Sequence, residues 1–263
     1  HARVARLGEG VAKRGSLLPE AVERTLAVLA EYRTLADEAD ASIEAVATEG
    51  LRLARDKDVF LERAHEVLGV PVRMISGEEE ARLSYLSVAR EHPEVAGMRV
   101  IDIGGASTEL AVGRGEFVDG VVSHKIGSVR LTEEHVGHDP ILLREILAIE
   151  ADARQAFESQ PLPMSEDLYG LAGTVTTTAA LLLGLDAYDR DRIDGTRWSV
   201  REIVGLRDAL AAEPLEVRTQ RSCLPPGRAD VVVAGLSILR VALEHCGAKT
   251  LIVRDRGLRY ALL

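Results

Sequence analysis

The residues best suited to chemistry stand in one short string, Asp102-Ile-Gly-Gly-Ala-Ser-Thr108. A buried-strand pattern precedes Asp102, and a carboxylate at the end of a buried strand is costly unless it meets a cation or several hydrogen-bond donors. Gly104 and Gly105 permit positive φ angles and let backbone N–H groups converge on an anion, while Ser107 and Thr108 add hydroxyl donors. The string therefore indicates a phosphate cradle with a carboxylate for a metal-bound water. The alternative is a plain hairpin turn, because Gly-Gly turns are common.

A second candidate corner is Gly173-Thr174, which stands between a predicted strand and a predicted helix. A helix N-terminus offers free N–H groups and partial positive charge to an anion, although a Gly-Thr helix start also occurs for capping alone. Arg6 and Arg52 are the strongest candidates for cationic phosphate contacts, because guanidinium binds phosphate through two hydrogen bonds. For any single arginine, a solvated surface position is the commoner role. The seven histidines show neither zinc-ligand nor Ser-His-Asp spacing.

Composition narrows the classes of function. Of 263 residues, 46% are hydrophobic but only 3% are aromatic, so the core must be built from aliphatic residues, as in alternating strands and helices. The net charge of −10 argues against a general nucleic-acid or membrane-surface binder, but a local group of arginines and amides still allows an anionic substrate. Cys223 and Cys246 lack metal-ligand spacing and are too few for a disulfide framework. With no membrane-length apolar run and no signal peptide, we expect a cytoplasmic protein.

The elements that must position these residues can be read from periodicity and turn signals. Residues 1–15 read as a strand end running into a loop. Helices are predicted near residues 18–35 and 60–68, and strands near 43–48 and 70–76. Gly77 opens a helix reaching about residue 91, whose first turn carries Glu78, Glu79 and Glu80. Carboxylates there suit the helix dipole, so capping alone could explain them.

A new unit starts at Met98. Strands over 99–103, 108–112 and 117–125 predict a hairpin meander, and Lys125 to Arg130 predicts a further strand-to-glycine corner. Helices follow near 142–157, 200–211 and 229–245, with strands near 167–172 and 250–254 and a terminal turn or helix at 257–263. We therefore predict two domains, residues 1–77 and 78–263, with the C-terminal residues packing back on the first.

Eight strings occur in an order that resembles the Ppx/GppA family of exopolyphosphatases and guanosine pentaphosphate phosphohydrolases. They begin at Arg6 (RLGEG), Ala47 (ATEGLR), Ser76 (SGEEEAR), Asp102 (DIGGASTEL), Gly127 (GSVRLT), Gly173 (GT), Arg228 (RADVVVAG) and Asp255 (DRGLR). The resemblance covers essentially the whole chain. It implies two RNase H-like α/β domains of the acetate kinase, sugar kinase, Hsp70 and actin superfamily, in the short form, with the active site in the interdomain cleft.

Carried over by position, the resemblance implies that Glu80 is the general base that orients water for attack on the terminal phosphorus. Asp102 matches the metal-associated aspartate, for Mg²⁺ or alternatively Mn²⁺. The turn after it, with Ala106 at its centre, matches a phosphate loop, and Arg52 matches an arginine that contacts substrate phosphate. Phosphoryl transfer depends on alignment and charge neutralisation, so this set is sufficient. Family members also imply a homodimer.

Three departures from the family pattern stand out. No Asp-x-Gly-(Ser/Thr)-Asn-(Ser/Thr) turn, the first phosphate loop of the family, occurs from His1 onward. If it lies upstream of His1, the assignment stands; if the protein lacks it, half of the phosphate clamp is absent. Ala106 replaces a usual glycine, which requires negative φ or an adjusted turn. Glu49 stands where a small residue is usual, placing extra negative charge near Arg52.

The leading hypothesis is hydrolysis of a terminal phosphoanhydride bond, of polyphosphate or of the 5′-γ-phosphate of guanosine pentaphosphate. The expected partners are thus polyphosphate or guanosine penta- or tetraphosphate, without nucleic acid or membrane. A polymer substrate predicts a basic track, for which Arg3, Arg6, Lys13 and Arg14 are candidates. One rival is a kinase or ATPase of the same superfamily, since fold alone does not fix function. The other is a non-catalytic sensor of an alarmone or polyphosphate.

Overall fold

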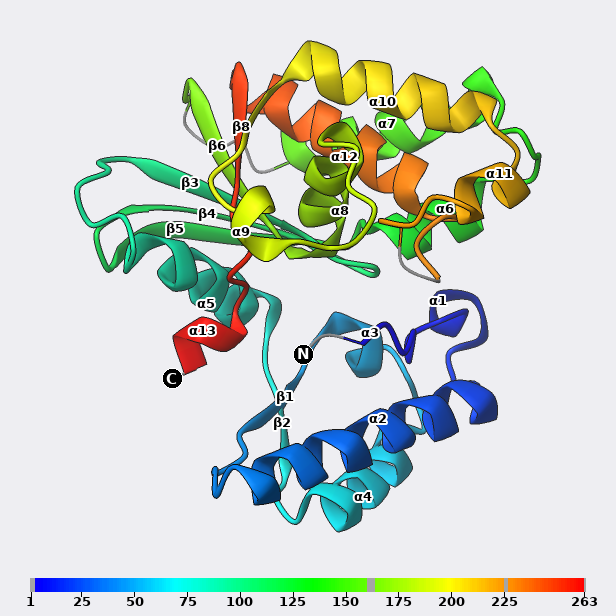
Figure 1. Cartoon of the computed structure of the whole chain (residues 1–263), viewed down its shortest axis with the longest axis vertical. Helices are drawn as coiled ribbons and strands as arrows, with labels where there is room; N and C mark the ends of the chain where they lie inside the picture. The colour runs from blue at the N-terminus through cyan, green and yellow to red at the C-terminus, as the bar shows by residue number, and fades with distance from the viewer. Residues whose placement is uncertain (1–2, 160–163, 225–226, 263) are drawn as a thin grey trace. The chain divides into compact units, whose positions relative to one another are not determined.

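The computed structural model describes residues 3–159, 164–224 and 227–262 (Figure 1). Backbone contacts divide the chain into two compact units, His1–Ser76 (unit 1) and Gly77–Leu263 (unit 2). None of the helices in the described ranges combines the length and the apolar character needed to cross a membrane.

Unit 1 pairs two helices with a two-stranded parallel sheet. Helix α2 (Pro19–Glu38) packs on α4 (Lys57–Leu68), and strands β1 (Ala45–Ala47) and β2 (Val72–Met74) pair with Ala45 opposite Val72. The described residues 3–15 contain no strand, so the prediction of a strand end there is wrong. Helix α1 (Val11–Arg14) lies there, because Gly10 and Gly15 adopt left-handed φ angles of 66° and 71° and so begin and end a single helical turn. Helix α3 (Glu49–Arg52) follows β1 directly.

Unit 2 is built on a six-stranded mixed sheet of order β5-β4-β3-β6-β8-β7 (Figure 1). Strands β3 (Met98–Ile103), β4 (Thr108–Arg114) and β5 (Phe117–His124) form an antiparallel meander, which confirms that prediction. Strands β6 (Asp167–Leu171) and β8 (Thr250–Val253) extend the sheet in parallel with β3. The short β7 (Arg197–Ser199) closes the edge antiparallel to β8.

Helices cover both faces of this sheet, as Figure 1 shows. Helix α5 (Gly77–Ala89) packs on β3, β4 and β5, and α13 (Arg259–Leu262) packs on α5. The opposite face carries α6 (Ser128–His135), α7 (Leu143–Glu158), α8 (Ala172–Leu182), α10 (Val200–Ala212) and α12 (Val232–His245). Short helices α9 (Arg190–Ile193) and α11 (Leu215–Thr219) lie in the connections.

Alternation along β3 decides which face each residue reaches. Ile101 and Ile103 join the core under α7, α8 and α12, whereas Val100 joins the core under α5. Because side chains alternate along a strand, Asp102 shares the α5 face with Val100. The strand therefore delivers its carboxylate to the layer between the sheet and α5.

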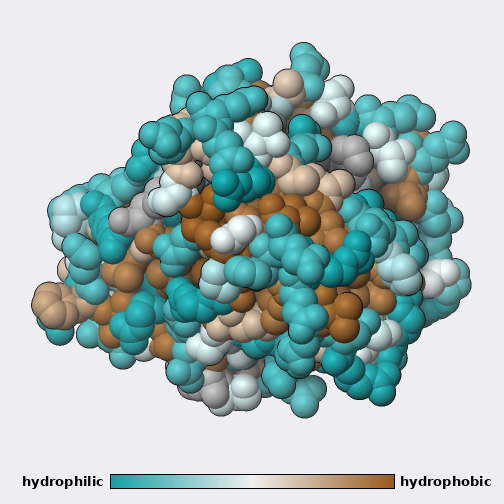
Figure 2. Space-filling model, turned by 90° about the horizontal axis from the view of Figure 1, so that it is seen from below, coloured by the Kyte–Doolittle hydropathy of each residue, from teal (hydrophilic) through white to brown (hydrophobic). Residues whose placement is uncertain are grey.

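The surface carries scattered apolar residues. Figure 2 shows one face, on which apolar side chains come to the surface between hydrophilic ones. Among the described residues, Leu143 and Leu147 are 68% and 54% exposed and lie one turn apart on α7. Isolated exposure of this kind is normal in folded chains and by itself identifies no interface.

Candidate active site

The centre of the site is Asp102 on β3. Its side chain is buried, and its Oδ2 accepts a hydrogen bond of 2.8 Å from the Ser84 hydroxyl on α5. Burial raises the pKa of Asp102 to about 6, while the Ser84 bond lowers it. Burial disfavours the charged form and a donor favours it. Burial thus disfavours the charged form of Asp102, and the Ser84 bond partly offsets that effect.

Glu80 lies in the same layer as Asp102. It stands four residues before Ser84 on α5, so both side chains lie on one face of that helix. Glu80 is buried at 7% exposure, whereas Glu78 is exposed, as expected if Glu78 only favours the helix start. Glu78 and Glu80 thus differ in burial, although they share one helical turn. The general-base role of Glu80 stays a prediction.

Glu109 is a site residue that sequence reasoning missed. It lies on β4 directly opposite Asp102, is 1% exposed, and its Oε1 accepts a 2.7 Å hydrogen bond from the Ser123 hydroxyl on β5. Directly opposed residues on antiparallel strands lie side by side on one face. A four-residue turn pairing Ile103 with Thr108 fixes this register, so the hairpin prediction could have identified Glu109.

These carboxylates are suitable for a hard cation. Buried oxygen donors suit Mg²⁺, which commonly uses one or two carboxylates, several waters and substrate phosphate. In the described part of the chain, the one group of three acidic or histidine ligands with atoms within 4.8 Å of one another is Glu134, His135 and Asp152, on α6 and α7. Glu80, Asp102 and Glu109 are not such a group, so a magnesium ion bound by Asp102 and Glu109 would need water and substrate phosphate as its other ligands.

The loop after Asp102 has two chemically different sides. The Gly104 carbonyl accepts a 3.0 Å hydrogen bond from the Ser128 N–H, and the Gly105 carbonyl accepts the next two N–H groups of α6, both at 3.0 Å. The N–H groups of Gly105, Ala106 and Ser107 donate to no described residue. The loop therefore holds a helix through its carbonyls and presents three amide donors suited to an anion.

Gly105 and Gly127 are needed because neighbouring atoms come too close for a side chain. Neither Gly104 nor Gly105 uses the left-handed φ that glycine permits. A Cβ on Gly105 would lie 3.1 Å from Val129 Cγ2, and one on Gly127 would lie 2.4 Å from the Gly105 carbonyl oxygen. Ala106 also lies outside the left-handed region, which explains why alanine fits there.

Two of the predicted hydroxyl contacts serve the protein itself. Thr108 is fully buried, and its hydroxyl donates to the Ile126 carbonyl at 2.8 Å. Thr174 is also buried, and its hydroxyl donates to the Ile103 carbonyl at 3.1 Å. Their phosphate-binding roles stay predictions, and the bonds seen here stabilise the two loops.

The Gly173-Thr174 corner lies beside the Asp102 loop. Parallel pairing places Asp102 next to Leu171, so both strands end at one edge of the sheet, and α8 begins there. Ala172, its first residue, has φ 68°, a conformation that costs a non-glycine residue energy and often marks functional sites. The structure therefore brings the two corners of unit 2 together, as their predicted common chemistry requires.

Arg228 is a second residue that sequence reasoning did not single out. A Cβ on Gly173 would lie 1.7 Å from an Arg228 terminal nitrogen, so the guanidinium occupies the space directly over Gly173. It forms no hydrogen bond or ion pair with the described residues, and burial lowers its pKa. A cation over a helix N-terminus favours an anion there. Its place in the Arg228-Ala-Asp string was the available signal.

The predicted arginines Arg6 and Arg52 belong to unit 1. A Cβ on Gly8 would lie 3.2 Å from the Gly50 Cα, so the loop that follows Arg6 packs on the helix that carries Arg52. Arg6 has φ 52°, again unusual for a non-glycine residue. Arg52 Nε donates to Glu49 Oε2 at 3.0 Å, and another nitrogen donates to the Ile75 carbonyl.

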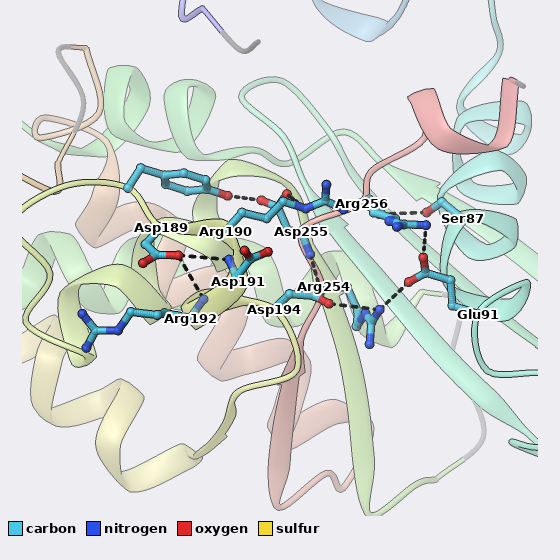
Figure 3. Close-up of polar contacts among 11 residues, drawn as sticks. Ser87, Glu91, Asp189, Arg190, Asp191, Arg192, Asp194, Arg254, Asp255 and Arg256 are labelled. Atoms are coloured by element: carbon cyan, nitrogen blue, oxygen red, sulfur yellow. Dashed lines mark hydrogen bonds and ion pairs between the residues drawn. The ribbon is translucent and has the colours of Figure 1, made fainter.

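The helix that carries Glu80 is anchored at its far end (Figure 3). Ser87 donates to the Arg256 carbonyl at 3.0 Å, and Glu91, just beyond α5, pairs with both Arg254 and Arg256. Arg254 also pairs with Asp194 at 3.2 Å. The segment after β8 therefore ties α5 to the sheet and to the loop after α9.

Comparison with known proteins identifies the family of this chain. The model of the Ppx/GppA phosphatase family matches residues 1–263. "Exopolyphosphatase 2" of Mycobacterium tuberculosis is 33% identical over 97% of this chain and 85% of its own length. "Guanosine-5'-triphosphate,3'-diphosphate pyrophosphatase" of Vibrio parahaemolyticus is 32% identical over 99% of this chain and 52% of its own. The crystal structure of the Aquifex aeolicus Ppx/GppA family member has a TM-score of 0.82 at 35% identity, over 99% of this chain and 85% of that one. The chain belongs to the Ppx/GppA phosphatase family.

Proposed function

We propose that this chain hydrolyses terminal phosphoanhydride bonds, releasing orthophosphate from inorganic polyphosphate or from the 5′-γ position of guanosine pentaphosphate. The observation that carries the proposal is a pair of buried acids, Asp102 and Glu109, which lie opposite each other on the two strands joined by a loop with three amide donors. Two relatives with this extent of similarity bear names for these two activities.

The roles of the chain's own residues follow from their positions. The amides of Gly105, Ala106 and Ser107 hold the terminal phosphate, and Arg228 supplies positive charge at the neighbouring corner. Glu80 accepts a proton from the attacking water as the water oxygen bonds to phosphorus. The bridging P–O bond breaks at the same time, and its electron pair stays on the oxygen of the shortened substrate. Arg52 of unit 1 is a further phosphate contact in this proposal.

We also propose Mg²⁺ as the cofactor, with Mn²⁺ as a substitute. Asp102 and Glu109 would hold it, because they are buried next to each other and carboxylate oxygens are the ligands that Mg²⁺ prefers. Bound there, the ion would neutralise phosphate charge that builds up during transfer. Ser84 keeps Asp102 oriented and favours its charged, metal-binding form.

Orthophosphate release tests the proposal. The chain is incubated with polyphosphate, with guanosine pentaphosphate, and with ATP plus candidate acceptors, with and without Mg²⁺. We expect Mg²⁺-dependent release from one or both of the first two, and a loss of about 10²- to 10⁴-fold in kcat for Glu80→Gln. Glu78→Gln, in the same helical turn but exposed, is the matched control. Binding without release, unaltered by Glu80→Gln, would leave the sensor hypothesis in place instead.

Assembly and location complete the proposal. The family resemblance supports a homodimer, which sedimentation equilibrium would test. A cytoplasmic location is supported by two free, buried thiols, Cys223 and Cys246, and fractionation of cells that express the chain would test it.

A further inference from the structure

The predicted phosphate ligand Arg52 already holds a carboxylate. Glu49 and Arg52 are the first and last residues of the four-residue helix α3, and i,i+3 spacing puts their side chains together. Arg52 donates from Nε at 3.0 Å and from a terminal nitrogen to the same oxygen, Glu49 Oε2. Its other terminal nitrogen donates to the Ile75 carbonyl.

This pairing uses the side of the guanidinium that an oxyanion would use. Guanidinium binds phosphate most strongly through two parallel N–H donors, and Glu49 occupies the Nε pair. The Ile75 carbonyl accepts from the other terminal nitrogen, which leaves one N–H on each terminal nitrogen for a second ligand. Phosphate can therefore use the Nε pair only if Glu49 leaves Arg52.

Burial makes that exchange costly. Glu49 is 7% exposed, whereas the Arg52 side chain is 25% exposed. A ligand can therefore reach the arginine, while the carboxylate is largely shielded from water. Breaking a buried ion pair leaves an uncompensated charge. A single phosphate bound at Arg52 meets this cost in full, whereas a chain of several phosphates can leave Arg52 paired with Glu49 and bind through its other phosphates.

We propose that Glu49 is a specificity-determining residue, an internal carboxylate that competes with phosphate for Arg52 and thereby favours polyanionic substrates over orthophosphate. This inference rests on the proposed function. It predicts weak inhibition by the orthophosphate product and a substrate affinity below the limit that Arg52 could provide.

Binding calorimetry tests the competition without turnover. Orthophosphate and inorganic tripolyphosphate are titrated into the Glu80→Gln chain with and without Glu49→Gln. Removing the charge should tighten orthophosphate binding by about tenfold, which corresponds to about 1.4 kcal/mol, and tripolyphosphate binding by less. In active chains, Glu49→Gln should lower the orthophosphate inhibition constant and KM, with a smaller effect on kcat.

Two controls separate competition from general disturbance. Glu23→Gln breaks another two-bond carboxylate–arginine pair of unit 1, with Arg63 at 2.7 and 3.1 Å, and should leave both affinities unchanged. Adding Arg52→Gln should abolish the gain from Glu49→Gln, because the competition acts only through that guanidinium. Circular dichroism verifies folding, and Glu49→Ala gives a second variant if the glutamine form unfolds.

The outcomes distinguish the two proposals. Unchanged orthophosphate affinity in Glu49→Gln, or a gain that survives Arg52→Gln, overturns the inference alone. Tighter binding of Glu49→Gln, with no orthophosphate released by the unsubstituted chain, supports competition and overturns the proposed hydrolysis. Absence of binding by every folded variant overturns both.

Discussion

The hydroxyl of Ser84 on α5 donates a 2.8 Å hydrogen bond to Oδ2 of Asp102 on β3. This bond joins the helix that carries Glu80 to the strand that ends in the phosphate loop. It also opposes the effect of burial on the Asp102 pKa. The pKa of Asp102 thus depends on a residue of another element, Ser84 on α5.

Ser84→Ala should shift the acidic limb of the pH–rate profile upward by about one pH unit. The bond stabilises the charged carboxylate, and hydrogen bonds to charged groups contribute about 1.5–3 kcal/mol, so its loss raises the Asp102 pKa further. Activity should therefore fall more at pH 6 than at pH 8. The profile of kcat/KM measures this, with exposed Ser159→Ala as the control. An unmoved acidic limb would contradict the role given to Ser84.

Asp102→Asn should abolish activity yet stabilise the metal-free protein near pH 7. The folded-state pKa is raised from 3.8 to about 6, so the folded chain holds a proton that the unfolded chain releases. The cost of the ionised form appears as pH rises from about 4 to about 6, and reaches at most about 3 kcal/mol. Denaturant unfolding should show the gain at pH 7 and little of it below pH 4. Equal stability of both proteins at pH 7 would count against a net cost of ionising the buried Asp102 carboxyl group.

Gly173→Ala should impair substrate binding by displacing Arg228. The new methyl group would overlap a guanidinium nitrogen, which lies 1.7 Å from the Cβ position. We expect KM to rise about tenfold or more, because a charged phosphate contact of this kind contributes about 1.5–3 kcal/mol. Arg228→Ala should have a similar effect, and the double variant should be no worse than either single one. Additive losses would show that the two residues act independently.

His124→Gln should make the fold less sensitive to mild acid. His124 is buried with its Nε2 unpartnered, and burial lowers its pKa from 6.5 to about 4. Because the unfolded chain takes up the proton first, the stability due to neutral His124 is present above pH 6.5 and is lost as pH falls toward 4. Thermal unfolding of both proteins between pH 7 and 4.5 measures the difference. His65→Gln, which changes an exposed histidine on α4, is the matched control. Parallel loss of melting temperature in the two proteins would refute the assignment.

Much of the fold follows from local patterns. The meander of β3, β4 and β5 was predictable because alternating apolar residues and short glycine turns leave few other pairings. The start of α6 was not, because its first N–H groups bond the carbonyls of Gly104 and Gly105, a tertiary contact. Strand β7 is three residues long and exists through pairing with β8, so its own sequence carries little signal.

The site was predictable to the extent that it is local. Asp102 and its loop could be identified from residue type and spacing. Glu109 could have been identified from the register of the predicted hairpin. Arg228 and Gly173 are far apart in the sequence, and only the tertiary structure brings them together. The Ser84 contact with Asp102 depends on which face of α5 is turned toward β3. Residue patterns therefore identify groups that do chemistry more readily than groups that adjust them.

The loop between Asp102 and Thr108 uses its peptide groups in both directions, toward a ligand and toward α6. An anion on the amide side polarises those peptide units and strengthens the carbonyls that hold the first turn of α6. Occupancy should therefore slow deuterium uptake at the N–H groups of Ser128, Val129 and Arg130, which bond to those carbonyls. Hydrogen exchange in the first turn of α6 would thus report whether an anion is bound to the loop, without any added probe group.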